Sequence, residues 1–149
     1  SAWIPSIALH GSPAAPNGAA SFEEWSNLLG AGLDDPDGDT HSNPIEYAFG
    51  LDPFTRRTIP ILALNPTAGE GLTSTFLFPA VAPGDVTVRI QSSTDLEFWT
   101  TEATRISNGP WTGSDDFESV TPASGFGVLR LHHPATLQWF TRIVVDFAP

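Results

Sequence analysis

The feature that most constrains the fold is the acidic stretch 35–46, in which oxygen-bearing side chains recur at fixed spacing. The predicted ligands at loop positions 1, 3, 5, 7, 9 and 12 are Asp35, Asp37, Asp39, the backbone carbonyl of His41, Asn43 and Glu46. This is the ligand spacing of an EF-hand-type calcium loop. Four carboxylates so close together would repel one another strongly without a cation between them. The stretch therefore predicts a Ca²⁺ site.

One position departs from the usual calcium loop. Position 6, where the chain turns sharply and glycine is usual, is Thr40, and the loop glycine is Gly38 at position 4. We expect either a strained Thr40 or a locally different path. The alternative interpretation is an acidic, solvated turn without an ion, because Asp, Pro and Gly are also ordinary turn formers.

Helical signals flank this loop on both sides. Ser21 and Glu24 have the spacing of a capping box, and apolar residues follow at helical intervals until Gly30 or Gly32. After the loop, Pro44 and Gly50 have the positions expected at the start and the end of a short helix. We predict a helix–calcium loop–helix unit over residues 21–57.

Short strands are predicted from Thr58 onward. Alternating or continuous apolar runs between turn residues cover 59–64, 72–78, 86–92, 126–132 and 138–147, with weaker runs at 101–107 and 117–120. The 14 prolines and 13 glycines supply turns between them. About seven such strands indicate an immunoglobulin-like antiparallel β-sandwich over 58–149.

Residues 1–20 differ from both parts. Trp3, Ile7 and Leu9 lie on one face of an extended strand, and a connector rich in Gly, Ser, Pro and Ala follows. Such an arm either folds back onto its own domain or adds to the sheet edge of a neighbouring copy. Both alternatives are open from the sequence.

Charge and composition exclude several partners. The formal net charge is −11, with six arginines and no lysine, so phosphate backbones and anionic membrane surfaces would be repelled. No stretch approaches the roughly 20 apolar residues of a membrane span. The chain begins at Ser1 and contains no methionine, as expected after removal of a signal segment. A low-affinity calcium loop also suits the millimolar calcium outside the cell, so we expect a secreted or cell-surface protein.

The motifs resemble a known family. A D-P-D-G-D-G-x-S-N-x-x-E-Y-A-x-G-x-D-P stretch before a small β domain containing S-S-T-D-L-x-x-W occurs at the C-terminus of many secreted proteins of Verrucomicrobia and Planctomycetes. The counterparts here are residues 35–53 and 92–99, and 139–145 is similar to that region's final strand. The loop is also similar to those of dockerins and thrombospondin type-3 repeats. The resemblance covers about 21–147 and implies an extracellular, noncatalytic, calcium-stiffened module.

Residues suited to catalysis are sparse. The sequence contains no cysteine nucleophile and no nucleophile elbow, phosphate-binding loop or zinc-protease motif, so we expect no enzyme. His132 and His133 are neighbours on a predicted strand and face opposite sides, in surface or capping roles. A second acidic cluster, around Asp115, is expected to be a solvated loop rather than a second ion site.

Three functional hypotheses follow. The first is a calcium-stabilised structural or assembly protein that polymerises when Trp3, Ile7 and Leu9 insert into a neighbouring subunit. The alternative is a polysaccharide-binding or adhesion module, for which Trp111 in a turn-rich segment is the best exposed aromatic candidate, although packing is also expected there. A third alternative is a stability spacer at the end of a longer polypeptide.

Overall fold

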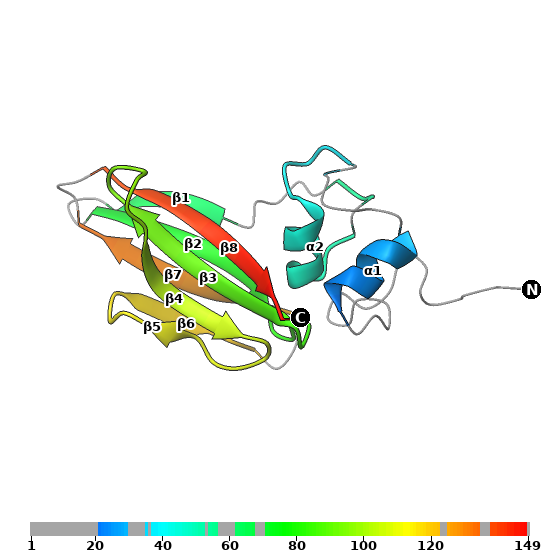
Figure 1. The fold of residues 1–149 in the computed structure, drawn as a ribbon. Helices are drawn as coiled ribbons and strands as arrows, with labels where there is room; N and C mark the ends of the chain where they lie inside the picture. The colour runs from blue at the N-terminus through cyan, green and yellow to red at the C-terminus, as the bar shows by residue number, and fades with distance from the viewer. Residues whose placement is uncertain are drawn as a thin grey trace, which may run out of the picture.

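The computed structural model describes residues 21–29, 35, 37–52, 54–56, 62–67, 71–122, 125–134 and 138–148. Within them the elements in chain order are α1 (Phe22–Leu29), α2 (Asn43–Phe49), β1 (Leu62–Thr67), β2 (Gly71–Pro79), β3 (Val86–Ser93), β4 (Thr100–Ile106), β5 (Thr112–Gly113), β6 (Phe117–Val120), β7 (Phe126–His133) and β8 (Phe140–Phe147) (Figure 1). The predicted arm, with Trp3, Ile7 and Leu9, lies outside the described residues.

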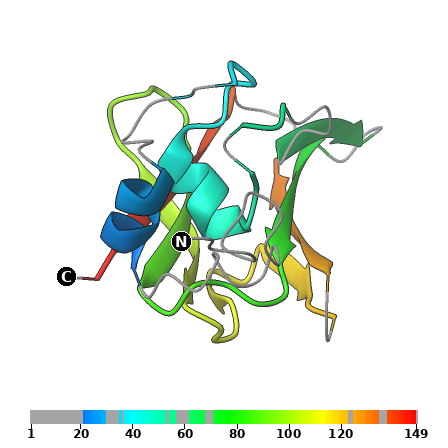
Figure 2. The same cartoon turned by 90° about the vertical axis from the view of Figure 1, so that its right-hand side faces the viewer.

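The strands form two antiparallel four-stranded sheets, which confirms the predicted β-sandwich class. We call the sheet with strand order β1-β2-β7-β6 sheet A and the sheet with order β5-β4-β3-β8 sheet B. The two sheets pack face to face, and the helices lie at one end of the sandwich (Figures 1 and 2). The strand β5 was not predicted, because two residues are too few to show an alternating pattern.

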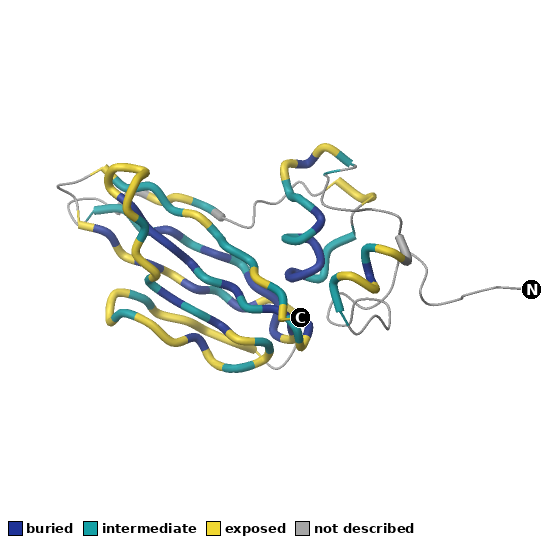
Figure 3. The backbone as a smooth tube through the Cα atoms, viewed as in Figure 1, coloured by how far each residue is buried: buried dark blue, intermediate teal, exposed yellow. Residues whose placement is uncertain are grey.

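The core follows the alternation of the central strands. On β3, Val86, Val88 and Ile90 point inward and are buried, and Leu129 and Leu131 of β7 do the same from sheet A. Because successive side chains of a strand face opposite sides, the intervening residues are more exposed along much of each strand (Figure 3). The hydrophobic cluster extends without a break from the sandwich into the helices, through residues such as Trp25, Tyr47 and Phe49.

Aromatic rings attach the two helices to the sandwich. The ring of Phe22 on α1 stacks on Phe147 at the end of β8, with ring centroids 4.4 Å apart. Tyr47 of α2 meets both rings edge to face, at 5.5 and 5.8 Å, and meets Trp25 at 5.4 Å. Offset and edge-on contacts of this kind contribute roughly 0.5–1.5 kcal/mol beyond burial. The helices are therefore part of the sandwich core.

Asp85, in the loop between β2 and β3, ties both helices to the sheets. One of its carboxylate oxygens accepts the backbone N–H of Phe22 at 2.9 Å, and the other accepts the hydroxyl of Tyr47 at 2.8 Å. The first bond satisfies a donor at the start of α1, where negative charge is also favourable. The predicted Ser21 cap is present as well, since the N–H of Glu24 donates to the Ser21 hydroxyl at 3.2 Å.

We predict that Asp85→Ala lowers the free energy of unfolding by about 2–3 kcal/mol, because it removes a helix cap and the partner of a buried hydroxyl. The matched control is Asp146→Ala, which removes only an exposed pair with Arg89 and should cost less than about 1 kcal/mol. Urea unfolding measures both variants. Equal losses would show that Asp85 does not anchor the helices.

Candidate metal site

Three aspartates predicted as ligands converge in the loop before α2. Asp35, Asp37 and Asp39 each offer a carboxylate oxygen, and these three atoms lie within 4.8 Å of one another. A cation bound at 2.3–2.6 Å from each ligand can span oxygens up to about 5 Å apart. The cluster could therefore hold a single metal ion.

Backbone N–H groups wrap the loop around Asp35. Its Oδ1 accepts the N–H of Gly38 at 2.8 Å and of Asp39 at 3.2 Å, and its Oδ2 accepts the N–H of Thr40 at 2.9 Å. Closing the chain this tightly places Gly38 and Thr40 at φ of +69° and +78°. The expected strain at Thr40 is confirmed, because a β-branched residue pays a steric cost at positive φ that glycine avoids.

The next two aspartates continue the same pattern. Asp37 Oδ1 accepts the N–H of Asp39 at 3.1 Å, and Asp39 Oδ1 accepts the N–H of His41 at 2.8 Å. The His41 ring nitrogen Nδ1 also lies 3.0 Å from Asp39 Oδ1. Only the carbonyl of His41 was expected to take part, so the contact of its ring with Asp39 was missed from the sequence.

Glu46, the predicted closing ligand, is the most unusual carboxyl group of the site. Its side chain is 1% exposed, and neither of its oxygens has a hydrogen-bond partner. Burial, followed by the negative charges of Asp37 and Asp39, raises its pKa to about 8. A buried charge without a partner is costly, so this carboxyl must either stay protonated or face a cation.

The second helix holds Glu46 in this position. Ser42 is the extended N-cap of α2, and its carbonyl accepts the N–H of Glu46 at 3.0 Å. Gly50 ends the helix at φ +65°, and the N–H of Leu51 returns to the carbonyl of Glu46 at 2.8 Å. Asn43, another predicted ligand, is fully buried in the first turn. Glu46 is not a member of the three-aspartate group, so the structure brings the predicted ligands only partly together.

The negative charges within the loop also favour a bound cation. Partial burial, and then the charges of Asp39 and Asp35, raise the pKa of Asp37. Its Oδ2 is buried without a hydrogen-bond partner. Asp37 Oδ2 and the two Glu46 oxygens could therefore contact a metal cation. The backbone N–H groups of the loop donate to other oxygens, such as Oδ1 of Asp37 and of Asp39.

The structure also places two tryptophans and His133. Trp111 is 8% exposed and packs edge to face on Phe78 at 5.3 Å, so the packing expected there is confirmed and the alternative of an exposed, sugar-binding face is wrong. Trp99 is half-buried, with the Arg142 guanidinium 4.0 Å from its ring centre. His133 is buried rather than at the surface, because it faces the core from β7 beside Ser74.

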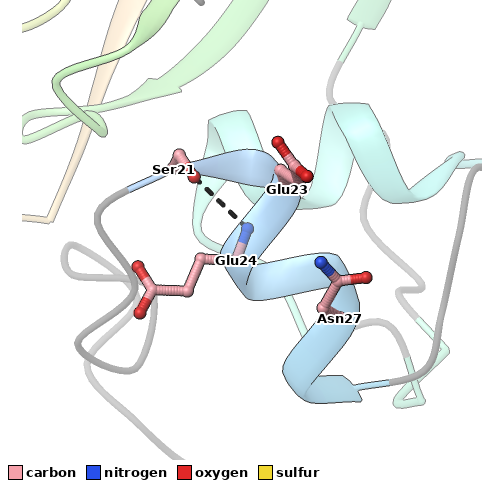
Figure 4. A pocket seen from close by; sticks show the side chains of 4 residues that line it. All are labelled: Ser21, Glu23, Glu24 and Asn27. Atoms are coloured by element: carbon pink, nitrogen blue, oxygen red, sulfur yellow. Dashed lines mark hydrogen bonds between the residues drawn. The ribbon is translucent and has the colours of Figure 1, made fainter.

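A second acidic cluster and a pocket lie outside the loop. Asp115, Asp116 and Glu118 are exposed, as expected for a solvated loop. A pocket of about 400 Å³ lies along the start of α1, where its described lining is Ser21, Glu23, Glu24 and Asn27 (Figure 4). Two carboxylates and two neutral polar groups give this lining no nucleophile and base in the arrangement that covalent catalysis requires.

Comparisons with known proteins do not assign the chain to a family. No family model matches the chain, and no curated protein matches it. Among the residues that the structure describes, no helix is long and apolar enough to cross a membrane.

We predict that Glu46 makes the metal-free protein less stable as the pH rises. The unfolded carboxyl ionises near pH 4.5, whereas the folded one keeps its proton up to about pH 8. Between these values the folded state binds more protons, so its stability falls with increasing pH. We expect urea unfolding in chelator, from pH 4 to 9, to show that the free energy of unfolding of Glu46→Gln rises relative to that of the wild type across this window.

Glu97→Gln is the control for that series, because Glu97 is exposed between β3 and β4. Its difference from the wild type should show no comparable trend. A flat difference for Glu46→Gln would mean that the buried carboxyl is already ionised and solvated when the protein folds.

Proposed function

We propose that this chain is a noncatalytic, calcium-binding structural protein of the cell exterior that assembles with copies of itself. The observation that carries the proposal is Glu46, a carboxyl buried without a hydrogen-bond partner beside three converging aspartates. Backbone N–H groups already donate to both oxygens of Asp35 and to Oδ1 of Asp37 and of Asp39. A bound cation accounts for both the burial and the convergence.

Calcium is the ion that this donor set favours. The predicted ligands of the site are oxygens, which suit hard cations better than zinc or copper. Magnesium requires near-octahedral geometry at about 2.0–2.1 Å and keeps several waters, whereas calcium accepts six to eight protein oxygens at longer distances. A loop that supplies three aspartates and ends at a fourth carboxylate, Glu46, matches the calcium requirement.

The ion would act by fixing α2. Glu46 and Tyr47 are consecutive, and Tyr47 donates to Asp85 and packs on Phe147 in the sandwich. An ion held between the loop and Glu46 would therefore stiffen the attachment of both helices to the sheets. Binding to the folded form alone adds roughly 2.7 kcal/mol when free calcium is 100 times the dissociation constant.

The cellular setting follows from the strain at the site. Thr40 at positive φ raises the cost of the bound loop conformation, so we infer a modest affinity. Modest affinity suffices where calcium is near millimolar, which favours a secreted or surface location. Repulsion by the net charge of −11 argues against nucleic acid as a partner.

We predict that calcium raises the melting temperature of the wild type and that chelator reverses the rise. Asp37→Ala should abolish this difference, because it removes a central ligand with a free buried oxygen. Isothermal titration calorimetry with CaCl₂, and separately with MgCl₂, should show heat of binding for calcium and at least about tenfold weaker binding of magnesium.

The matched control is Asp115→Ala, which removes an exposed carboxylate outside the loop. It should keep the full calcium response. Identical melting of the wild type with calcium and with chelator would refute the proposed ion. Equal responses of the two alanine variants would refute the proposed site.

A further inference from the structure

The inward face of sheet A is uncovered at its edge strand β1. Leu64 on β1 pairs with Ser74 on β2, which pairs in turn with Leu131 on β7. Residues directly opposite each other in antiparallel strands share a face. Ser74 and Leu131 are 0% and 1% exposed, so this face points into the core, yet Leu64 is 55% exposed.

The facing sheet stops short of β1. The hydroxyls of Ser74 and Thr141 lie 3.4 Å apart, so β8 lies across from β2 rather than from β1. Among the described strands of sheet B, β8 pairs with β3 and has no neighbour at its other edge. Its inward residues Ile143 and Val145 are only half-buried, although their partners on β3 are buried.

In the part of the chain that the structure describes, no strand lies next to β8 on that side and opposite β1. We call this place the open seam and define it by Leu64, Thr141, Ile143 and Val145. Both β1 and β8 run along the same long side of the sandwich (Figures 1 and 2). On the other long side the chain passes from β5 in sheet B to β6 in sheet A through residues 114–116, which connects the two sheets there.

We propose that residues 3–9 of a second copy of this chain add as a strand to the free edge of β8 and cover Leu64. This deepens the assembly part of the proposed function and rests on it. The segment has the required pattern, since Trp3, Ile7 and Leu9 share one face of an extended strand. Seven residues at about 3.3 Å each also match the length of β8, which has eight.

Proline 5 sets the pairing of the added strand. Because Pro5 has no N–H, its nitrogen must point away from β8. The residues that hydrogen-bond to β8 are then Ile4, Ser6 and Ala8, which alternate with it. Trp3, Ile7 and Leu9 have the same parity as Pro5 and therefore share one face of the added strand, which the proposal places toward the core and Leu64.

The connector favours a second copy over the same chain. Residues 10–20 carry Pro13 and Pro16, and proline-containing linkers extend rather than reverse tightly. Phe22, the first residue of α1, stacks on Phe147 at the end of β8, so a strand of the same chain that runs antiparallel to β8 would require residues 10–20 to return along its whole length. A head-to-tail contact between a donor arm and an acceptor seam also leaves one arm and one seam free, which permits open chains.

The test separates donor from acceptor. Leu64→Asp keeps the arm but places a charge in the seam. Deletion of residues 1–12 keeps the seam but removes the arm. In sedimentation experiments with calcium, the full chain should self-associate with increasing concentration, and each variant alone should be monomeric or associate about tenfold or more weakly. Mixed together, the two variants should form a 1:1 complex.

Val120→Asp is the matched control, because Val120 is 64% exposed on β6, at the opposite edge of sheet A. It should associate like the wild type. Equal loss in Leu64→Asp and Val120→Asp, or full association after deletion of residues 1–12, overturns the proposal. A full chain that is monomeric also overturns it. If the two variants still form a 1:1 complex in that case, the arm of the full chain covers the seam of the same molecule.

Melting temperatures measured with and without calcium test the proposed ion separately from the proposed strand addition. Both seam variants retain the loop aspartates and Glu46, so their calcium response should equal that of the wild type and also shows that they fold. A full chain that stays monomeric but keeps its calcium response refutes the strand addition and leaves the proposed ion untouched. Association without any calcium response refutes the ion and leaves the seam supported.

Discussion

A carboxyl group buried among other carboxyl groups is the constraint on which the rest of this structure depends. Glu46 is buried with no hydrogen-bond donor for either oxygen, and the charges that raise its pKa are the aspartates of the loop. Folding must therefore supply either a proton or a cation at this point. The first choice fails as the pH rises toward about 8, whereas a cation serves at any pH at which the loop is ionised.

The position of Glu46 in the chain connects this local problem to the whole fold. The next residue, Tyr47, belongs to an aromatic cluster with Phe22 and Phe147, and its hydroxyl meets Asp85. The same Asp85 carboxylate caps α1. With the proposed ion bound, the acidic loop would hold one side of α2 while Tyr47 holds the other side to the sandwich.

Local signals in the sequence were sufficient for much of this. The aspartate spacing, the helix caps and the alternation of the long strands depend on neighbours within a few residues, and the structure reproduces them. The role of Asp85 could not be predicted, since its partner Phe22 is 63 residues away. The same limit explains Trp111, whose turn-rich surroundings suggest exposure while Phe78 of another strand covers it. The burial of Glu46 is likewise a property of the assembled core.

The most direct test is the anomalous diffraction signal of crystals grown with calcium, collected at long wavelength where calcium scatters anomalously. The account predicts one peak in the loop, about 2.3–2.6 Å from oxygens of Asp35, Asp37 and Asp39 and from the carboxylate of Glu46. Only water at hydrogen-bond distance, or an ion that leaves Glu46 without contact, would contradict it.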